Sequence, residues 1–405
     1  LDILKFFLLT TINILGHFTL IFFKNNKKKY DLLCDNVFSQ LDVDRFTNLI
    51  KSFKKTCLLG SFYKKKKVKN EEYFKFNKYF IGRSKTSFKE KFFFIFLCLK
   101  IFYYSMKYRF NLFTVFLPLV YDIYKSSYIF SIISSKYFIT QKFYGTSPIF
   151  NFYFKKNGGK ITSCTQKNIC NLSLSPFVFT DVMFTLGKDQ GKICNQLGGK
   201  IKYFKPVGSL FMEDAWFRKN RDLKNIPRSD ILILGFNTLT NNYHYINDDY
   251  VRSYYDFYLS WIKKLSSELK KKIILKHHAD YSMDPKEENV IKDANIDLFI
   301  NNKSINASYG WAFKSKIVLS FASTMIVELL GHGKEAYYID PNLKGEQWFK
   351  DVRNLKKYRL GSYKAVRSLI SNRKKKLIKK SERDYYCLNS RNTSKEISKF
   401  LKRFT

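Results

Sequence analysis

The chain has 405 residues, which is too long for one ordinary hydrophobic core and suits two domains of roughly 150 to 200 residues each. Hydrophobic residues make up 45% of it, a share that excludes an intrinsically disordered chain. The formal charge of +40 would suggest a polyanionic partner, but Lys, Asn, Phe, Tyr and Ile are abundant together, and A- and T-rich codons encode all of them. Because no motif in the chain reads bases, we do not expect nucleic acid to be the partner.

The first 23 residues are mostly apolar, and the basic segment 24–29 (KNNKKK) follows them at once. That length suffices to span a bilayer, and the basic flank would stay in the cytoplasm. Asp2, Lys5 and His17 weaken this interpretation. Residues 1–29 are therefore expected to form an apolar N-terminal helix, either as a membrane anchor or as a buried first helix.

Two aromatic runs follow at residues 92–99 (FFFIFLCL) and 113–120 (FTVFLPLV). Each is too short to span a bilayer, and Lys100, Lys107 and Arg109 stand between them. We favour a core helix here, and a basic surface helix lying on lipid headgroups is the alternative.

Short apolar segments broken by Gly, Ser and Asn occupy residues 144–214, a texture typical of short strands alternating with loops and helices. Residues 215–229 are polar and precede a strongly apolar run, so the domain boundary is predicted there. This gives an N-terminal α/β domain over residues 30–214 and a C-terminal α/β domain over residues 230–405.

The C-terminal domain shows a clear alternation of strands and helices. Continuous apolar runs, typical of parallel strands buried on both faces, are found at residues 230–236, 272–275, 316–320 and 336–340. Helices are predicted between the first two, where Phe257, Trp261, Leu265 and Leu269 share one face, and at residues 325–330. This order predicts a doubly wound parallel sheet with ligands at the carboxyl ends of its strands.

A phosphate site is expected where the third of these strands meets the following helix. Ser320 ends the strand, and the hydroxyls of Ser323 and Thr324 would lie beside free N–H groups of the helix start. Glu328 lies one helical turn beyond Thr324 and would accept a hydrogen bond from a sugar or ribose hydroxyl. The alternative is that a serine only caps the helix and Glu328 is a surface acid.

A second group, Lys276, His277 and His278, directly follows the second strand. A lysine there would pair with a diphosphate, and a neutral imidazole would hydrogen-bond it. Adjacent histidines face opposite ways, so at most one of them is expected to act. No metal site is predicted, since no third ligand lies at a suitable spacing, and the seven cysteines form no C-x-x-C pair and are expected to be reduced.

Taken together, the segments 273–278 (IILKHH), 318–331 (VLSFASTMIVELLG) and 337–341 (YYIDP) resemble GT-B-type transferases of bacterial surface-polysaccharide synthesis. This group includes capsule and lipopolysaccharide glycosyltransferases, sialyltransferase-like proteins and CDP-glycerol glycerophosphotransferases. The resemblance implies two Rossmann-like domains facing across a cleft. It also implies that the nucleotide donor is bound by Lys276, His277, Ser320, Ser323, Thr324 and Glu328.

The N-terminal half is similar to the acceptor domain of the same group in segments 161–166, 178–187 and 203–209. Gly208 and Ser209 would let the backbone approach a diphosphate, although a simple interdomain turn explains them equally well. Where the group often has His and Gly, this chain has Gln166, Lys167 and Asn168. If that His is the general base, another residue must replace it, and Asp181 and Asp189 are candidates without further support.

The resemblance implies a metal-independent glycosyltransferase that uses a nucleotide-sugar donor, needs no separate cofactor, and acts on a surface polysaccharide or glycolipid. It further implies a location at the cytoplasmic face of the inner membrane, with an anionic membrane surface as a partner. Two alternatives remain open. One is a CDP-polyol phosphotransferase, and the other is a catalytically silent, carbohydrate-binding protein with a GT-B-like fold.

Overall fold

The computed structural model of the chain describes residues 27–37, 40–60, 71–75, 88–108, 112–141, 143, 146–166, 169–170, 175–213, 215, 226–235, 257–269, 271–277, 285–294, 296–300, 305–321, 323–343, 350–372 and 378–404. The apolar helix predicted for residues 1–29 falls almost wholly outside these ranges. No helix within them is long and apolar enough to cross a membrane.

The chain divides into two compact units. The first contains Leu1–Thr165, Val178–Val182 and Ser398–Thr405, and the second contains Gln166–Phe177 and Met183–Ile397. Residues 183–213 group with the C-terminal half in this division. The reason is that they form hydrogen bonds with Asp351 and with residues between 384 and 394. The domain limits predicted at residues 30–214 and 230–405 stay a prediction.

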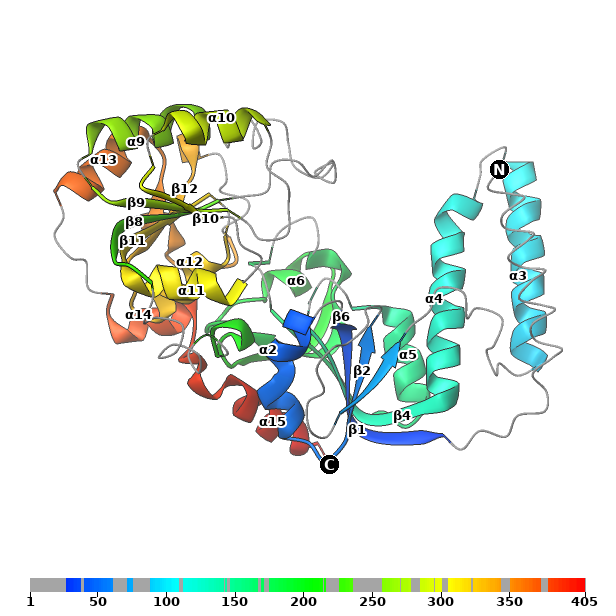
Figure 1. Cartoon of the computed structure of the whole chain (residues 1–405). Coiled ribbons are helices and arrows are strands. Elements are labelled where there is room, and N and C mark those ends of the chain that lie inside the picture. Colours follow the sequence, from blue (N-terminus) through cyan, green and yellow to red (C-terminus); the bar gives the residue numbers. More distant parts are fainter. Residues whose placement is uncertain are drawn as a thin grey trace. The chain divides into compact units, whose positions relative to one another are not determined.

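A seven-stranded sheet has the order β3-β2-β1-β4-β5-β6-β7 (Figure 1). The pairs from β3 through β5 are parallel. Its strands are β1 (Lys28–Val37), β2 (Thr56–Gly60), β3 (Glu71–Lys75), β4 (Ile133–Thr140), β5 (Ile161–Thr165), β6 (Phe179–Thr185) and β7 (Lys200–Pro206). The helical elements associated with it along the chain are α2 (Gln40–Lys51), α3 (Phe88–Lys107), α4 (Phe113–Ile132), α5 (Pro148–Lys156), η3 (Ser175–Phe177) and α6 (Ile193–Gln196).

Aromatic side chains fill much of the first unit's core. The ring of Phe150 on α5 lies 4.8 Å from Phe130 on α4 and 4.8 Å from Phe138 on β4, measured between centroids. Helix α5 begins here because the Ser147 hydroxyl accepts a hydrogen bond from the Phe150 N–H at 3.2 Å and Pro148 occupies the first turn. The alternation of short strands and helices predicted for residues 144–214 is confirmed.

A six-stranded sheet in the second unit has the order β10-β9-β8-β11-β12-β13, and its pairs are all parallel. Its strands are β8 (Ser229–Leu234), β9 (Ile273–Lys276), β10 (Leu298–Ile300), β11 (Ser315–Ser320), β12 (Ala336–Ile339) and β13 (Arg359–Leu360). The four strands predicted from apolar runs correspond to β8, β9, β11 and β12. The predicted doubly wound parallel sheet is confirmed.

Helices accompany this second sheet along the chain. They are a π-helical segment (Phe257–Ile262) leading into α9 (Lys263–Glu268), then α10 (Pro285–Asp293), α11 (Ile305–Lys314), α12 (Met325–Gly331), a 3-10 turn (Leu355–Tyr358), α13 (Tyr363–Ser371), α14 (Lys380–Tyr386), a 3-10 turn (Ser390–Asn392) and α15 (Thr393–Lys402). Phe257, Trp261 and Leu265 are buried together, as their shared helical face predicts. The three central residues of β8 are fully buried, which agrees with a sheet covered on both faces.

Candidate functional site

The order of the second sheet changes direction at β8. The chain runs from β8 outward to β9 and β10, and then returns to β11 on the other side of β8. In parallel α/β sheets, ligands bind outside the carboxyl ends of the strands at such a switch point. The three strand ends that meet here are connected, because the Gly235 N–H donates to the Lys276 carbonyl at 2.8 Å and the Ser320 hydroxyl donates to the Leu234 carbonyl at 3.2 Å.

Lys276 and Ser320 lie at the same level of the sheet. Lys276 pairs in register with Leu234 on β8, and Leu234 pairs with Ser320 on β11. Neighbouring strands are about 4.8 Å apart, so the two residues are separated by about 10 Å across the switch point. Lys276 is 2% exposed, and His277, the next residue, is 1% exposed. The structure thus places a buried lysine and a buried imidazole at the same edge of the sheet as the hydroxyl at the end of β11, with β8 between them.

The predicted phosphate-binding segment forms a compact turn between β11 and α12. The Ser320 hydroxyl accepts a hydrogen bond from the Ser323 N–H at 3.3 Å, and the Ser323 hydroxyl accepts one from the Met325 N–H at 3.3 Å. The Thr324 carbonyl accepts hydrogen bonds from the first turn of the helix. Both serine hydroxyls therefore accept hydrogen bonds from backbone N–H groups at this turn, as the capping alternative requires.

Glu328 lies on α12 with only 2% of its surface exposed, so it is not a surface acid. One of its carboxylate oxygens accepts a hydrogen bond from the Ser209 hydroxyl, and the other accepts one from the Tyr309 hydroxyl on α11 at 2.5 Å. Two residues predicted to bind the donor, Ser209 and Glu328, are therefore in direct contact. Tyr309 connects α11 to α12 through this carboxylate.

Gly208 adopts a positive φ of 90°, and its Cα packs against the segment that begins α15. A Cβ added there would lie 2.9 Å from the Ser390 hydroxyl and 2.9 Å from the Leu388 carbonyl, so only glycine fits this approach. The Ser209 N–H donates to the Ser390 hydroxyl at 3.0 Å, and the Thr393 hydroxyl donates to the Val207 carbonyl at 3.0 Å. The 207–209 turn thus anchors the C-terminal segment.

His332 holds the same C-terminal segment from the other end of α12. Its Nδ1 lies 2.9 Å from the Glu328 carbonyl, and its Nε2 accepts a hydrogen bond from the Ser390 N–H at 3.3 Å. Burial lowers the pKa of His332, which favours this neutral form. No local pattern indicates this contact, since it joins residues 58 positions apart.

Gln166, which stands where a His was expected, is a buried structural residue. Its side-chain carbonyl accepts a hydrogen bond from the Leu186 N–H at 3.1 Å, and its amide donates to a carboxylate oxygen of Asp351 at 3.0 Å. The same oxygen of Asp351 accepts from the Cys170 N–H at 3.2 Å, and the other accepts from the Gly191 N–H at 2.7 Å. Asp351 therefore joins the segments that follow β5 and β6, whereas Lys167 and Asn168 lie outside the described residues.

The buried position of Asp351 predicts an unusual pH dependence. Burial raises its pKa to about 6, although the three hydrogen bonds oppose this shift. In an unfolded chain the pKa is about 3.9. Because the folded value is the higher one, the stabilisation is complete below pH 4 and is lost as the pH rises towards 6.

We expect the difference in unfolding free energy between the wild type and Asp351→Asn to change by about 2 kcal/mol between pH 4 and pH 7, with the wild type relatively more stable at pH 4. Urea titrations of both proteins at the two pH values measure this. A difference that does not vary with pH would show that Asp351 is ionised normally in the folded protein.

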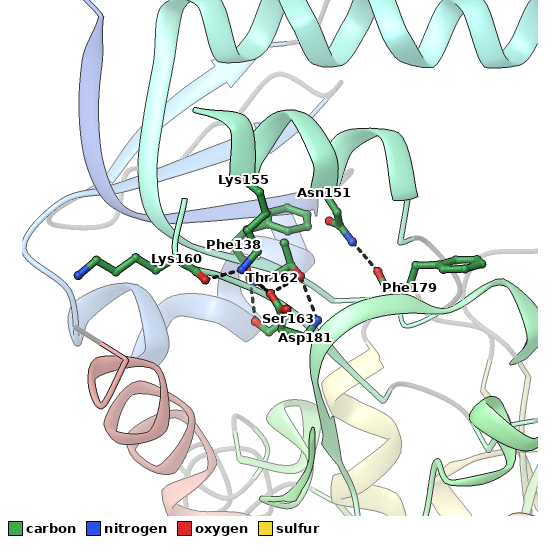
Figure 2. A network of polar contacts seen from close by, with 8 residues as sticks. All are labelled: Phe138, Asn151, Lys155, Lys160, Thr162, Ser163, Phe179 and Asp181. Carbon is green, nitrogen blue, oxygen red and sulfur yellow. Dashed lines mark hydrogen bonds and ion pairs between the residues drawn. The ribbon is translucent and has the colours of Figure 1, made fainter. Parts of the chain in front are cut away.

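The two other candidate bases lie in different surroundings. Asp181 lies near the start of β6: one of its oxygens accepts hydrogen bonds from the N–H and hydroxyl of Thr162, both at 2.9 Å, and lies 2.7 Å from the Lys155 ammonium (Figure 2). Asp189 lies in the turn after β6 with a positive φ of 63° and forms an exposed ion pair with Lys192 at 2.7 Å. That hydrogen bond lowers the pKa of Asp189. Asp181 therefore has a structural role near the start of the strands.

Two α/β units built on parallel sheets, with polar strand ends at the switch point of the second, define a GT-B-type fold, and the predicted resemblance is confirmed at this level. No protein-family model matches the chain, and no curated protein matches it in sequence.

Three solved structures illustrate this similarity of fold. UDP-N-acetylglucosamine 2-epimerase from Rickettsia bellii shares 13% identity over 93% of this chain and 96% of its own, with a TM-score of 0.51. The S. aureus MnaA protein, solved with UDP, shares 11% identity over 92% of this chain and 96% of its own, with a TM-score of 0.52. The wall teichoic acid polymerase TagF shares 9% identity over 92% of this chain and 88% of its own, with a TM-score of 0.50. At such low identity the likeness establishes the fold alone.

Proposed function

We propose that the protein is a glycosyltransferase that binds a nucleotide-activated sugar at the switch point of the second sheet and transfers the sugar to a surface polysaccharide or glycolipid. The observation that carries this proposal is the row formed by Lys276, Leu234 and Ser320 across β9, β8 and β11, with His277 beside it. A buried cation and hydroxyls at this edge suit a diphosphate. The fold shared with a UDP-bound protein supports the same choice of ligand.

In this proposal the protein stabilises the negative charge that develops on the leaving nucleoside diphosphate. The ammonium of Lys276 supplies the positive charge, and the hydroxyls of Ser323 and Thr324 supply hydrogen bonds. Charge stabilisation of this kind needs no metal ion, so we propose a metal-independent transfer. The acceptor hydroxyl would lose its proton to a base other than Gln166, because Gln166 cannot accept a proton and is held by Leu186 and Asp351.

A second candidate is transfer of a polyol phosphate from a CDP-linked donor, which the similarity of fold to the wall teichoic acid polymerase favours. The same edge of the sheet would bind its diphosphate. A third candidate is a catalytically silent carbohydrate-binding protein, which the replacement of the expected His by a buried Gln166 favours. A position at the cytoplasmic face of the membrane, close to a lipid-linked acceptor, belongs to the leading proposal.

Product analysis separates the three candidates. The full chain is incubated with UDP-, GDP- and CMP-sugars or CDP-glycerol and a glycan or glycolipid acceptor, and products are identified by mass spectrometry. A sugar adduct supports the leading proposal, a phosphate-containing adduct supports the second, and donor binding without turnover supports the third.

Lys276→Met is expected to lower kcat/KM by about 100-fold or more. Lys272→Met, an exposed residue at the opposite end of β9, serves as the control and should leave it unchanged. Equal activity of the two variants would reject the assigned site.

A further inference from the structure

Helix α3 presents an apolar face to solvent. Phe96, Leu99, Tyr103 and Met106 are 59%, 61%, 60% and 67% exposed. Their spacing of three, four and three residues places them on one stripe of the helix. The core interpretation of this segment is therefore wrong for this face.

The opposite side of α3 is the packed side. Ile101 is 6% exposed, and the Ser105 hydroxyl donates to its carbonyl at 2.8 Å while accepting a hydrogen bond from the Leu112 N–H at 3.2 Å. At 100° per residue, Ile101 and Ser105 lie about opposite Phe96 and Tyr103. Helix α3 runs alongside α4 (Figure 1), to which the chain returns through Leu112. The exposed stripe is thus the outer face of a helix whose inner face is packed.

Positive charge borders this stripe. Lys100 and Lys107 are exposed and lie one heptad apart, at one edge of the row formed by Phe96 and Tyr103. In sequence, α3 contains four lysines and a single acidic residue, Glu90. A helix with long apolar and aromatic side chains beside lysines has the composition of one that lies in a membrane interface. Lysine stems can follow the apolar surface while the ammonium groups reach phosphates.

We propose that the outer face of α3, formed by Phe96, Leu99, Tyr103 and Met106 with Lys100 and Lys107, docks on the surface of an anionic lipid bilayer. The apolar side chains enter the boundary between headgroups and acyl chains, and the lysines contact anionic headgroups. The charge of this face selects anionic lipid as the occupant, because an apolar stripe with Lys100 and Lys107 along one edge complements a negative surface. The inference does not depend on the donor-site proposal, since it uses none of the residues of the second sheet.

The test is flotation of the full chain with vesicles of phosphatidylcholine alone or with 30% phosphatidylglycerol. We expect the partition coefficient to be roughly tenfold or more higher on the anionic vesicles at low salt, and to fall as salt is added. Leu99→Glu combined with Met106→Glu is expected to lower binding to anionic vesicles by roughly tenfold or more. Lys100→Glu combined with Lys107→Glu should lower it by about tenfold on anionic vesicles and much less on neutral ones.

Phe152→Glu on α5 is the matched control, because Phe152 is 61% exposed but lies outside α3. It should bind vesicles like the wild type, and all variants should keep the wild-type melting temperature, since the changed side chains are exposed. Binding that is equal for the wild type and both α3 variants would overturn the proposal. So would light scattering that shows a dimer for the wild type and a monomer for Leu99→Glu with Met106→Glu, without vesicle binding, because the face would then join two copies of the chain.

Discussion

Replacing Arg359 by Ala is expected to lower the free energy of unfolding by about 3–5 kcal/mol, because it leaves a buried carboxylate without its cation. Arg359 on β13 donates to Asp340 through Nε at 2.8 Å and through a second guanidinium nitrogen, which also donates to the Leu343 carbonyl at 3.0 Å. Both side chains of the pair are about 95% buried, with exposures of 4% and 5%. Urea denaturation followed by circular dichroism measures the loss.

The chain offers a matched control for this change. Arg367 on α13 pairs with Glu268 at 3.3 Å, but its side chain is 60% exposed. Arg367→Ala should therefore change stability by about 1 kcal/mol at most. Changing the buried pair together, as Asp340→Leu with Arg359→Met, should recover much of the lost stability. If Arg359→Ala costs no more than Arg367→Ala, the buried pair does not hold β12 and β13 together.

Replacing Glu328 by Ala is expected to cost about 2–4 kcal/mol, because it removes the acceptor of two buried hydroxyls. The hydroxyls of Ser209 and Tyr309 would then lie in the interior without this carboxylate. Glu328→Gln keeps one carbonyl oxygen and should cost less. Glu288→Ala on α10, whose side chain is 52% exposed, is the control and should change stability by roughly 0.5 kcal/mol or less. Thermal and urea unfolding of the three variants measure this ranking.

A stability loss in Glu328→Ala has a consequence for tests of function. A variant that unfolds more readily also loses ligand binding for that reason alone, so loss of binding in it does not show contact with a nucleotide. An unchanged stability in Glu328→Ala would contradict the buried position and return Glu328 to the residues available for a ligand. Thr324, which is only partly buried, is a better reporter of the donor site.

The strands of the second sheet could be predicted because they are buried on both faces and read as continuous apolar runs. The strands β1 and β3 could not be predicted in this way. Their sequences, KKYDLLCDNV and EEYFK, carry charges that the structure accommodates, because Glu72 at the edge strand β3 accepts a hydrogen bond from Tyr30 at 2.6 Å and pairs with Lys28. Such contacts join residues more than 40 positions apart, and a local pattern does not reveal them.

The candidate site was predicted to a similar degree. Lys276 and Ser320 could be placed at strand ends from the apolar runs before them, but their common row depends on the strand order, which sequence alone does not give. Asp351 had no signal at all, since its partners Gln166, Cys170 and Gly191 lie 160 to 185 positions away. The shared helical face of Thr324 and Glu328 could be predicted from their spacing. The hydrogen bonds that the Ser209 and Tyr309 hydroxyls donate to Glu328 could not, because they come from distant segments.

The most direct test of a donor site at this switch point is the binding of nucleotides to the full chain. Melting temperatures of the wild type, Lys276→Met, Thr324→Ala and the control Lys272→Met are measured with UDP, CDP, GDP and CMP. A nucleotide at about 100 times its dissociation constant should stabilise the wild type and the control by about 2.7 kcal/mol. It should raise their melting temperatures by a few degrees and those of Lys276→Met and Thr324→Ala by clearly less. If no nucleotide stabilises the folded wild type, or if all four proteins respond alike, the donor site is not at the carboxyl edge of the second sheet.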